Sequence, residues 1–337
     1  MSSHMHVVIP NLFLPQGLAA ECYAGLRLPA LEKLLARAQP EPLRQDTLEA
    51  WMCSVFGIRD GAIAPVTLRA DGLEPGSNYW LRADPVCLHL RRDQLVLQSG
   101  LDPGMDEAEQ LCSSLNRHFA GTGMHFVAPH PQRWYLQLDS EPDLITQPVS
   151  RVAGKDVHEY LPDGKDALHW HGVLNEIQML LFEHQVNLAR EDAGKLPVNS
   201  IWLWGGGHWS GQLTGSYRRV MGDSDLAAAF AGAVGIPYES FHQDVLRETG
   251  KADQVLIAIE SLHRAMQRGD IHAWRNLLLN LEQNIAAPLL QALQTGKVGT
   301  VTLDILQEGA AQRFVINRRD LWKLWRLPAS LDKYALV

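Results

Sequence analysis

The chain of 337 residues lacks several features that would assign it to a class at once. Its four cysteines form no CxxC pair, which excludes a zinc ribbon and a thioredoxin motif. No apolar run approaches ~18 residues, so we expect no membrane contact through a spanning segment. A basic excess is also missing, because the net charge is −8, and we therefore expect no nucleic-acid partner. The start of the chain does not resemble a signal peptide, so we expect reduced thiols in a cytoplasmic protein.

The composition is that of an ordinary globular protein, with 46% hydrophobic and 20% charged residues. At ~150 residues per domain, the length predicts two domains, or one domain that carries an insertion. Residues 1–5, MSSHM, fit either a segment derived from a cloning vector, with the native start at Met5, or a native N-terminus. The fold prediction therefore begins after them.

Apolar runs of strand type alternate with amphipathic helical segments, which predicts an α/β fold with a mostly parallel sheet flanked by helices. A β-β-α-β-β pattern interrupts this alternation and predicts a small inserted α+β subdomain at residues 81–140. The core would then be discontinuous, with residues 1–80 and 141–337 on either side of the insertion. The predicted core strands are 6–9, 198–204, 255–260, 299–306 and 313–316, and the predicted long helices are 28–38, 166–192 and 272–293.

The sharpest local motif is LPVNSIWLWGGGH at Leu196–His208. Three glycines after a predicted strand allow backbone N–H groups to approach an anion closely. The motif is not a Walker loop, because no GK[ST] follows, and it is not GxGxxG. A tight turn without a ligand is the alternative interpretation.

Several segments resemble the archaeal-type cofactor-independent phosphoglycerate mutases of the alkaline phosphatase superfamily. HQVNLAR at His184–Arg190, followed by VNSIWLWGGG at Val198–Gly207, is similar to a paired helix and strand motif of that family. Weaker similarities are ADPVCLHL at 83–90, LPALEKLLARA at 28–38 and VTLDILQEG at 301–309. The resemblance implies an alkaline-phosphatase-like fold with an inserted subdomain.

The departures from the family pattern concern its chemistry. Enzymes of the family hold two divalent metals with Asp and His residues and use a Ser or Thr nucleophile. This chain has Leu28 at the nucleophile, Asn11 at the first ligand, Ile259 and Ile305 at two further ligands, and Trp204 at an arginine. The resemblance implies that Asp304 and His263 are the metal ligands that remain. Leucine cannot be a nucleophile and isoleucine cannot bind a hard cation, so the chain resembles a degenerate branch, the RpfE-type regulatory proteins.

The resemblance also implies a ligand-binding cleft. The predicted ligand-binding residues are Asn187, Arg190, Asn199, Trp204, Gly205, Gly206, Gly207 and His208. A fixed arginine suits a phosphate or carboxylate, so we expect a small anionic ligand. The alternatives are a solvated or carbonyl-capping Arg190, and an Asn199 that makes only structural hydrogen bonds.

Three functions follow from these observations. The first is a non-catalytic regulatory or ligand-binding protein that needs no cofactor. The second is a phosphoglycerate mutase or phosphatase-type enzyme, dependent on Mn or Zn, with a site rebuilt from Asp304, His263, His208 and Ser200. The third is a protein-interaction module, because Trp322 and Trp325 lie on a predicted terminal helix, where they would either pack in the core or contact a protein partner.

Overall fold

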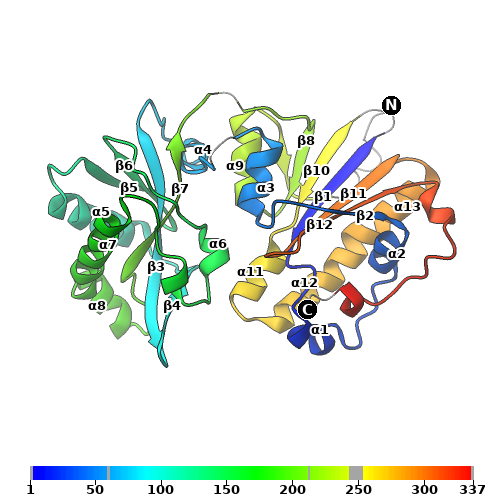
Figure 1. Cartoon of the computed structure of the whole chain (residues 1–337), viewed down its shortest axis with the longest axis horizontal. Helices are drawn as coiled ribbons and strands as arrows, with labels where there is room; N and C mark the ends of the chain where they lie inside the picture. Colours follow the sequence, from blue (N-terminus) through cyan, green and yellow to red (C-terminus); the bar gives the residue numbers. More distant parts are fainter. Residues whose placement is uncertain (1–2, 59–60, 212, 243–252, 335–337) are drawn as a thin grey trace. The chain divides into compact units, whose positions relative to one another are not determined.

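The computed structural model describes residues 3–58, 61–211, 213–242 and 253–334. The chain divides into two compact units, which are described separately (Figure 1). Unit 1 comprises residues 1–56 and 214–337, and unit 2 comprises residues 57–213.

Unit 1 is built on a seven-stranded sheet in the order β2-β12-β11-β1-β10-β8-β9. The strands from β11 to β9 run parallel. At one edge β12 is antiparallel to β11, and β2 is antiparallel to β12. This is the mostly parallel α/β sheet that the sequence predicts. The strands are β1 His4–Pro10, β2 Gln39–Pro42, β8 Arg219–Gly222, β9 Tyr238–Glu239, β10 Gln254–Ala258, β11 Thr300–Leu306 and β12 Gln312–Asn317.

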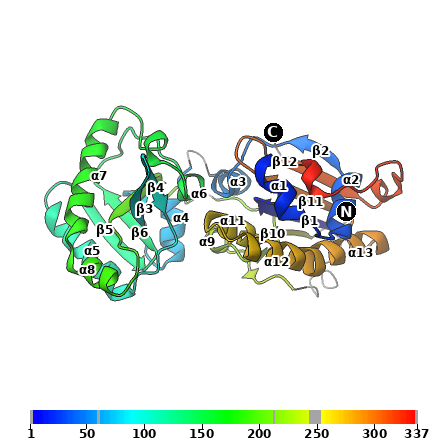
Figure 2. The same cartoon turned by 90° about the horizontal axis from the view of Figure 1, so that it is seen from below.

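The two faces of this sheet differ in chemistry because side chains alternate along a strand. Met5, Val7 and Ile9 of β1 join one apolar cluster with five helices, and Figure 2 shows α12 and α13 along that face. His4 and His6 point the other way, where Trp51 of α3 contacts His6. The helices are α1 Gln16–Tyr23, α2 Pro29–Arg37, α3 Leu48–Val55, α9 Asp225–Ala233, α11 Ser261–Gln267, α12 Ile271–Leu281, the π-turn η2 Glu282–Ala286, α13 Ala287–Thr295, and the 3₁₀ turns η3 Asp320–Trp322 and η4 Leu331–Tyr334.

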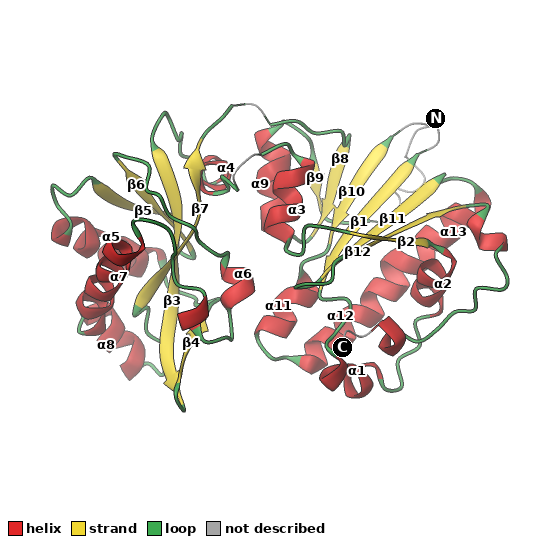
Figure 3. Cartoon of the chain, viewed as in Figure 1, coloured by secondary structure: helices red, strands yellow, loops and turns green. Residues whose placement is uncertain are grey.

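Unit 2 contains a five-stranded antiparallel sheet in the order β4-β3-β6-β5, with β7 paired to the other edge of the long strand β3. One face packs against α5, α7 and α8, and the other packs against α4 (Figure 3). The strands are β3 Tyr79–Arg91, β4 Gln94–Gln98, β5 Met124–His130, β6 Arg133–Leu138 and β7 Ser200–His208. The helices are α4 Ala64–Ala70, α5 Met105–His118, α6 Val149–Val152, the 3₁₀ turn η1 Val157–Glu159, α7 Ala167–Phe182 and α8 Gln185–Asp192.

The second unit is therefore larger than the expected insertion at 81–140. The run at 198–204, predicted as a parallel strand of the core, is β7 and lies antiparallel to β3 inside unit 2. An apolar run looks the same in either setting, because strand pairing depends on distant residues. The helices α7 and α8 also belong to this unit and pack on its sheet.

Three element boundaries also differ from the prediction. The helix expected at 166–192 breaks into α7 and α8, because the ring of His184 accepts a hydrogen bond from Val186 N and begins a new helix. The expected terminal helix at 320–325 shortens to the single turn η3. His4 and Met5, set aside in the sequence analysis, form part of β1.

Several local features of the two units follow from short-range interactions. Arg92 and Asp93 form the β3–β4 turn, with Arg92 in the left-handed region at φ 57°. Ser224 caps α9 by accepting a hydrogen bond from Ala227 N. All four cysteines are free thiols. Within the described ranges, no helix has both the length and the apolar character needed to span a membrane.

Candidate functional site

The glycine triplet lies within β7 and serves close packing. A Cβ on Gly206 would overlap Tyr79 Oη, and one on Gly207 would overlap Ala62 Cβ. Gly205 adopts φ +64°, which favours glycine, and a Cβ added there would lie 3.2 Å from Ile63 Cβ. These contacts supply a structural reason for all three glycines. They give no support to the prediction that backbone N–H groups of this motif bind an anion.

Trp204 belongs to a buried polar network in unit 2. Its indole N–H donates to Asp84 Oδ2 at 2.7 Å, and the Arg82 guanidinium donates to Asp84 Oδ1 at 2.6 and 2.9 Å. Arg82 also lies over the rings of Trp204 and Tyr135, 5.2 Å from each centroid. The chain has Trp204 where the family it resembles has an arginine. A cation is nevertheless present beside Trp204, contributed by the neighbouring strand β3.

The polar residues of the helix and strand motif are also satisfied internally. Asn187 makes three hydrogen bonds of 2.8 Å with Leu181 O and with the backbone N and O of Val198. Arg190 donates to Leu196 O and forms a 2.6 Å ion pair with Glu107. Asn199 exchanges two hydrogen bonds with the Leu88 backbone.

Both alternatives left open above are thus realised: Arg190 binds a carbonyl and Asn199 is a structural bridge. His208 is exposed and contacts Ser77 O. Ser200 and His208 are the first and last residues of a nine-residue strand, which places them about 26 Å apart at ~3.3 Å per residue. The pairing of Ser200 with His208 that a rebuilt site would need is therefore ruled out.

In unit 1, Asp304 is the centre of a second buried network. Its carboxylate accepts hydrogen bonds from Arg313 Nε and Nη2 at 2.8 and 2.7 Å, from His6 Nε2 at 2.8 Å and from Trp51 Nε1 at 2.7 Å. The ring of His6 continues the chain to Tyr217 Oη through Nδ1 at 2.7 Å. Burial alone would raise the pKa of Asp304, but the hydrogen bonds from Arg313 and His6 outweigh it and lower that pKa to about 2. Asp304 is thus an ionised carboxylate whose four donors all come from the protein.

The start of α2 is closed by a carboxylate as well. Leu28, at the position of the family nucleophile, is buried and supplies no capping side chain. Glu282 of the π-turn fills that role, because its two oxygens accept hydrogen bonds from Ala30 N and Leu31 N at 2.8 and 2.9 Å. The free N–H groups that would attract a phosphate to this helix end are therefore occupied.

His263 lies at the carboxyl edge of the sheet, where ligands bind in open α/β folds. Its Nδ1 donates to Asn11 Oδ1 at 2.6 Å, so Nε2 carries the lone pair. This buried Nε2 has no hydrogen-bond partner among the described residues. Burial and the nearby Arg264 lower the pKa of His263 to about 4, so the ring is neutral at pH 7. The arrangement leaves one neutral hydrogen-bond acceptor at the edge.

Two carboxyl groups lie at the ends of the adjacent strands. Asp223 follows β8, and its Oδ1 accepts hydrogen bonds from Glu260 N and Ser261 N. Glu260 follows β10, and burial raises its pKa to about 7 despite a hydrogen bond from Ser224. Gly222 makes this approach of strands feasible, because a Cβ there would overlap Ala258 O. Glu260 can therefore lose or gain a proton near neutral pH.

These residues do not fit two divalent metals. A cation at Asp304 would have to displace the Arg313 guanidinium as well as the hydrogen bonds from His6 and Trp51. His263 is bonded to Asn11 and shares no partner with Asp304. In the ranges that the structure describes, no group of three or more His, Cys, Asp or Glu side chains could hold a metal ion. The metal role predicted for Asp304 and His263 gains no support from this geometry.

Six residues that define these networks are not predicted from the sequence: His6, Trp51, Arg82, Asp84, Glu282 and Arg313. A signal existed for three of them. Arg82 and Asp84 alternate inside an apolar strand, and so share one face of it. Arg313 is a charged residue in a short apolar strand next to the one that carries Asp304.

Comparison with known proteins agrees with the fold and these sequence motifs. The chain is 26% identical over 207 residues to the 2,3-bisphosphoglycerate-independent phosphoglycerate mutase of Methanosarcina mazei, covering 55% of this chain and 52% of that protein. It is 27% identical over 211 residues to the enzyme of the same name from Methanosarcina barkeri, covering 56% and 53%. The chain spans about half the length of these curated relatives.

The structure of the PH0037 protein from Pyrococcus horikoshii superposes with a TM-score of 0.52 at 13% identity, over 94% of this chain and 87% of that chain. No family model matches the sequence. The protein is an α/β protein with a mostly parallel sheet in unit 1, and its fold is similar to that of the PH0037 protein. Its homologues are the archaeal-type cofactor-independent phosphoglycerate mutases.

Proposed function

We propose that this phosphoglycerate-mutase-like chain is a regulatory or ligand-binding protein that carries out no metal-dependent phosphoryl transfer. The observation that carries the proposal is the Asp304 carboxylate, whose oxygens accept four hydrogen bonds from Arg313, His6 and Trp51. Transfer between two metals needs carboxylates that are free to bind them, because charge develops on both the attacking and the leaving oxygen.

Two further observations support the proposal. The nucleophile position holds the buried side chain of Leu28, which has no group that could accept a phosphoryl group. The adjoining helix end is bonded to Glu282, a carboxylate that repels phosphate. The nucleophile position, the helix end that could bind phosphate and the metal-ligand position Asp304 are thus all unsuited to phosphoryl transfer.

The ligand proposed for this protein binds at the carboxyl edge of the unit 1 sheet. His263 Nε2 offers a buried acceptor there, so the ligand would donate a hydrogen bond to it. The residues predicted to bind a small anion in unit 2 make their hydrogen bonds to the protein instead. A hydrogen-bond donor is therefore favoured over a phosphate or carboxylate.

A mutase assay with 3-phosphoglycerate and Mn²⁺ tests the main proposal, with the Methanosarcina mazei enzyme as positive control. We expect no turnover by this chain above the buffer blank. Metal-dependent turnover that Asp304→Ala abolishes would overturn the proposal.

A second candidate is an acid–base enzyme at the same edge, which Glu260 favours because its pKa of about 7 suits proton transfer at neutral pH. A phosphatase assay with p-nitrophenyl phosphate, run for the unaltered protein and Glu260→Gln, tests it. Turnover that Glu260→Gln removes would support the enzyme, and its absence leaves the regulatory proposal in place.

A further inference from the structure

Near its C-terminal end the chain exposes a short segment rich in large apolar side chains. This segment, Arg318–Leu327, is called here the tryptophan segment. Its exposed fractions are 77% for Trp322, 65% for Leu324, 76% for Trp325 and 76% for Leu327. Single exposed apolar residues are ordinary on a protein surface, but four within six positions mark an interaction site.

The tryptophan segment is basic in an acidic protein. It carries Arg318, Arg319, Lys323 and Arg326 against the single acid Asp320, a net charge of +3. Because the whole chain has a net charge of −8, all other residues together carry −11. An acidic protein surface attracts such a segment, whereas an anionic bilayer would repel most of the chain.

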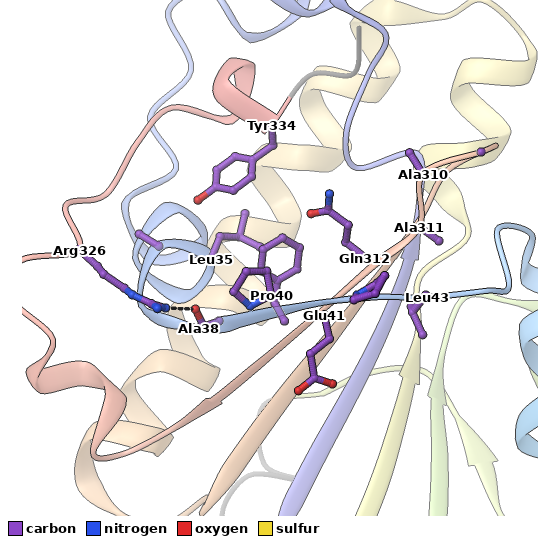
Figure 4. Close-up of a pocket in the computed structure, with 14 residues that line it drawn as sticks. Leu35, Ala38, Pro40, Glu41, Leu43, Ala310, Ala311, Gln312, Arg326 and Tyr334 are labelled. Atoms are coloured by element: carbon purple, nitrogen blue, oxygen red, sulfur yellow. Dashed lines mark hydrogen bonds between the residues drawn. The ribbon is translucent and has the colours of Figure 1, made fainter.

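The same unit contains a cavity of about 760 Å³ beside α2 and the edge strand β2 (Figure 4). Its walls combine the apolar side chains of Leu35, Pro40 and Phe314 with polar groups, among them Glu41 and Arg326. The volume lies within the ~300–1,000 Å³ of pockets that bury drug-sized ligands, so it can accept indole rings.

Arg326 joins the tryptophan segment to this cavity. The residue lines the cavity, and its Nη1 donates to Ala38 O at 2.6 Å. Exposed tryptophans thus lie in the same short segment as a residue of the cavity wall. A second copy related by a two-fold axis could place its tryptophans in this cavity and receive the first copy's in return, which is a closed, self-complementary contact.

The edge strand β2 beside the cavity is poorly suited to forming a dimer by pairing with a strand of a second copy. The strand β2 forms the edge of the sheet, and its sequence QPEP has prolines at positions 40 and 42. Proline has no backbone N–H, so this edge is a poor template for adding a strand.

We propose that the chain forms a two-fold dimer in which the tryptophan segment of each copy fills the cavity of the other. Two tryptophans about three-quarters exposed present roughly 300 Å² per chain, since an aromatic residue buries roughly 150–250 Å². The cavity walls expose less area than the two indole rings, so the exposed Leu324 and Leu327 of the tryptophan segment would complete the contact.

Sedimentation velocity of the full chain over a wide concentration range tests the dimer. The unaltered protein should sediment with twice the chain mass of 37.6 kDa. The double variant Trp322→Ser, Trp325→Ser removes the inserted side chains, and Ala310→Arg obstructs the cavity from a half-buried loop position. Each should raise the dimer dissociation constant roughly 30-fold or more, the effect of losing an interface hot spot.

The matched control is Leu168→Ser, Met179→Ser in unit 2, which removes two apolar side chains that are 85% and 77% exposed. It should leave the dimer intact. An equimolar mixture of the segment and cavity variants should recover partial association, because one of the two reciprocal contacts can still form.

A monomer at all concentrations would overturn the proposal, as would a dimer that persists in both variants. Pelleting of a monomeric protein with phosphatidylcholine–phosphatidylglycerol vesicles, but not with phosphatidylcholine alone, would assign the tryptophan segment to a lipid surface instead.

Discussion

Arg313 and Asp304 face each other across the antiparallel strands β12 and β11, and the guanidinium binds both carboxylate oxygens. The side chain of Asp304 is fully buried, and that of Arg313 is 33% exposed. An aspartate that the family resemblance assigns as a metal ligand is thus held in an ion pair. The proposed loss of metal chemistry depends on this relationship.

Removing the cation should destabilise unit 1. In Arg313→Met the buried Asp304 loses two hydrogen bonds and its charge partner, and breaking a buried pair costs about 3 kcal/mol or more. Urea denaturation measures the loss. Arg218→Met, at a pair whose arginine is 79% exposed, is the control and should leave the midpoint unchanged. Equal midpoints for the two variants would show that the Asp304 network contributes no stability.

The same pair predicts acid sensitivity. The folded pKa of Asp304 is about 2 and the unfolded value is about 3.9, so its contribution is present above pH ~4 and is lost as the pH falls toward 2. The loss should amount to about 2–3 kcal/mol. Unfolding free energies measured from about pH 5 down to about pH 2 should show this fall in the unaltered protein. In Arg313→Met the fall should be smaller, because no guanidinium holds the pKa down.

His263 predicts a second pH dependence at higher pH. Its folded pKa of about 4 lies below the unfolded value of ~6.5, so the unfolded state binds more protons between these values. The contribution of His263 to stability should therefore decrease as the pH falls from ~6.5 to ~4, by on the order of 3 kcal/mol. Glu260, with a folded pKa of about 7, changes stability in the opposite direction over this range, so the contribution is measured as the difference between the unaltered protein and His263→Gln. His263→Gln should remove this dependence, whereas His169→Gln, at an exposed histidine, should retain it.

The glycine triplet can be tested as a packing feature. Gly206→Ala places a Cβ against Tyr79 Oη and should cost about 1–3 kcal/mol, typical of overpacking. Tyr79→Phe removes the clashing oxygen and should restore part of that loss. Gly172→Ala is the control, because nothing lies within 4 Å of its added Cβ and alanine favours the helix α7. A Gly206→Ala protein as stable as the control would argue for a role other than packing.

Trp204 should contribute through its N–H group. Trp204→Phe keeps an aromatic ring but removes the 2.7 Å hydrogen bond to Asp84, which should cost about 1.5–3 kcal/mol because the acceptor is charged. Thermal melting measures the change. Trp325→Phe, at a residue that is 76% exposed, should leave the melting temperature unaltered.

The sequence predicts the α/β class and the β-β-α-β-β pattern that contains β3 to β6, because each depends on local pattern. It does not predict that β7 pairs with β3, since the register of Leu203 opposite Ala83 joins residues 120 positions apart. The candidate site likewise contains residues that the sequence identifies and residues that it does not. Asp304 and His263 are found from motif positions, but the donors that surround Asp304 come from β1, α3 and β12. Only the folded chain brings those three elements together.

The metal content of the purified, untagged protein decides whether Asp304 is an ion-pair residue or a metal ligand. It would be measured as isolated, and again after a soak in Mn²⁺ or Zn²⁺ followed by desalting. We expect no stoichiometric metal in either sample, because the Asp304 oxygens are bonded to Arg313, His6 and Trp51. Two tightly held metal ions per chain would contradict the proposed loss of metal chemistry and restore a two-metal phosphoryl-transfer enzyme.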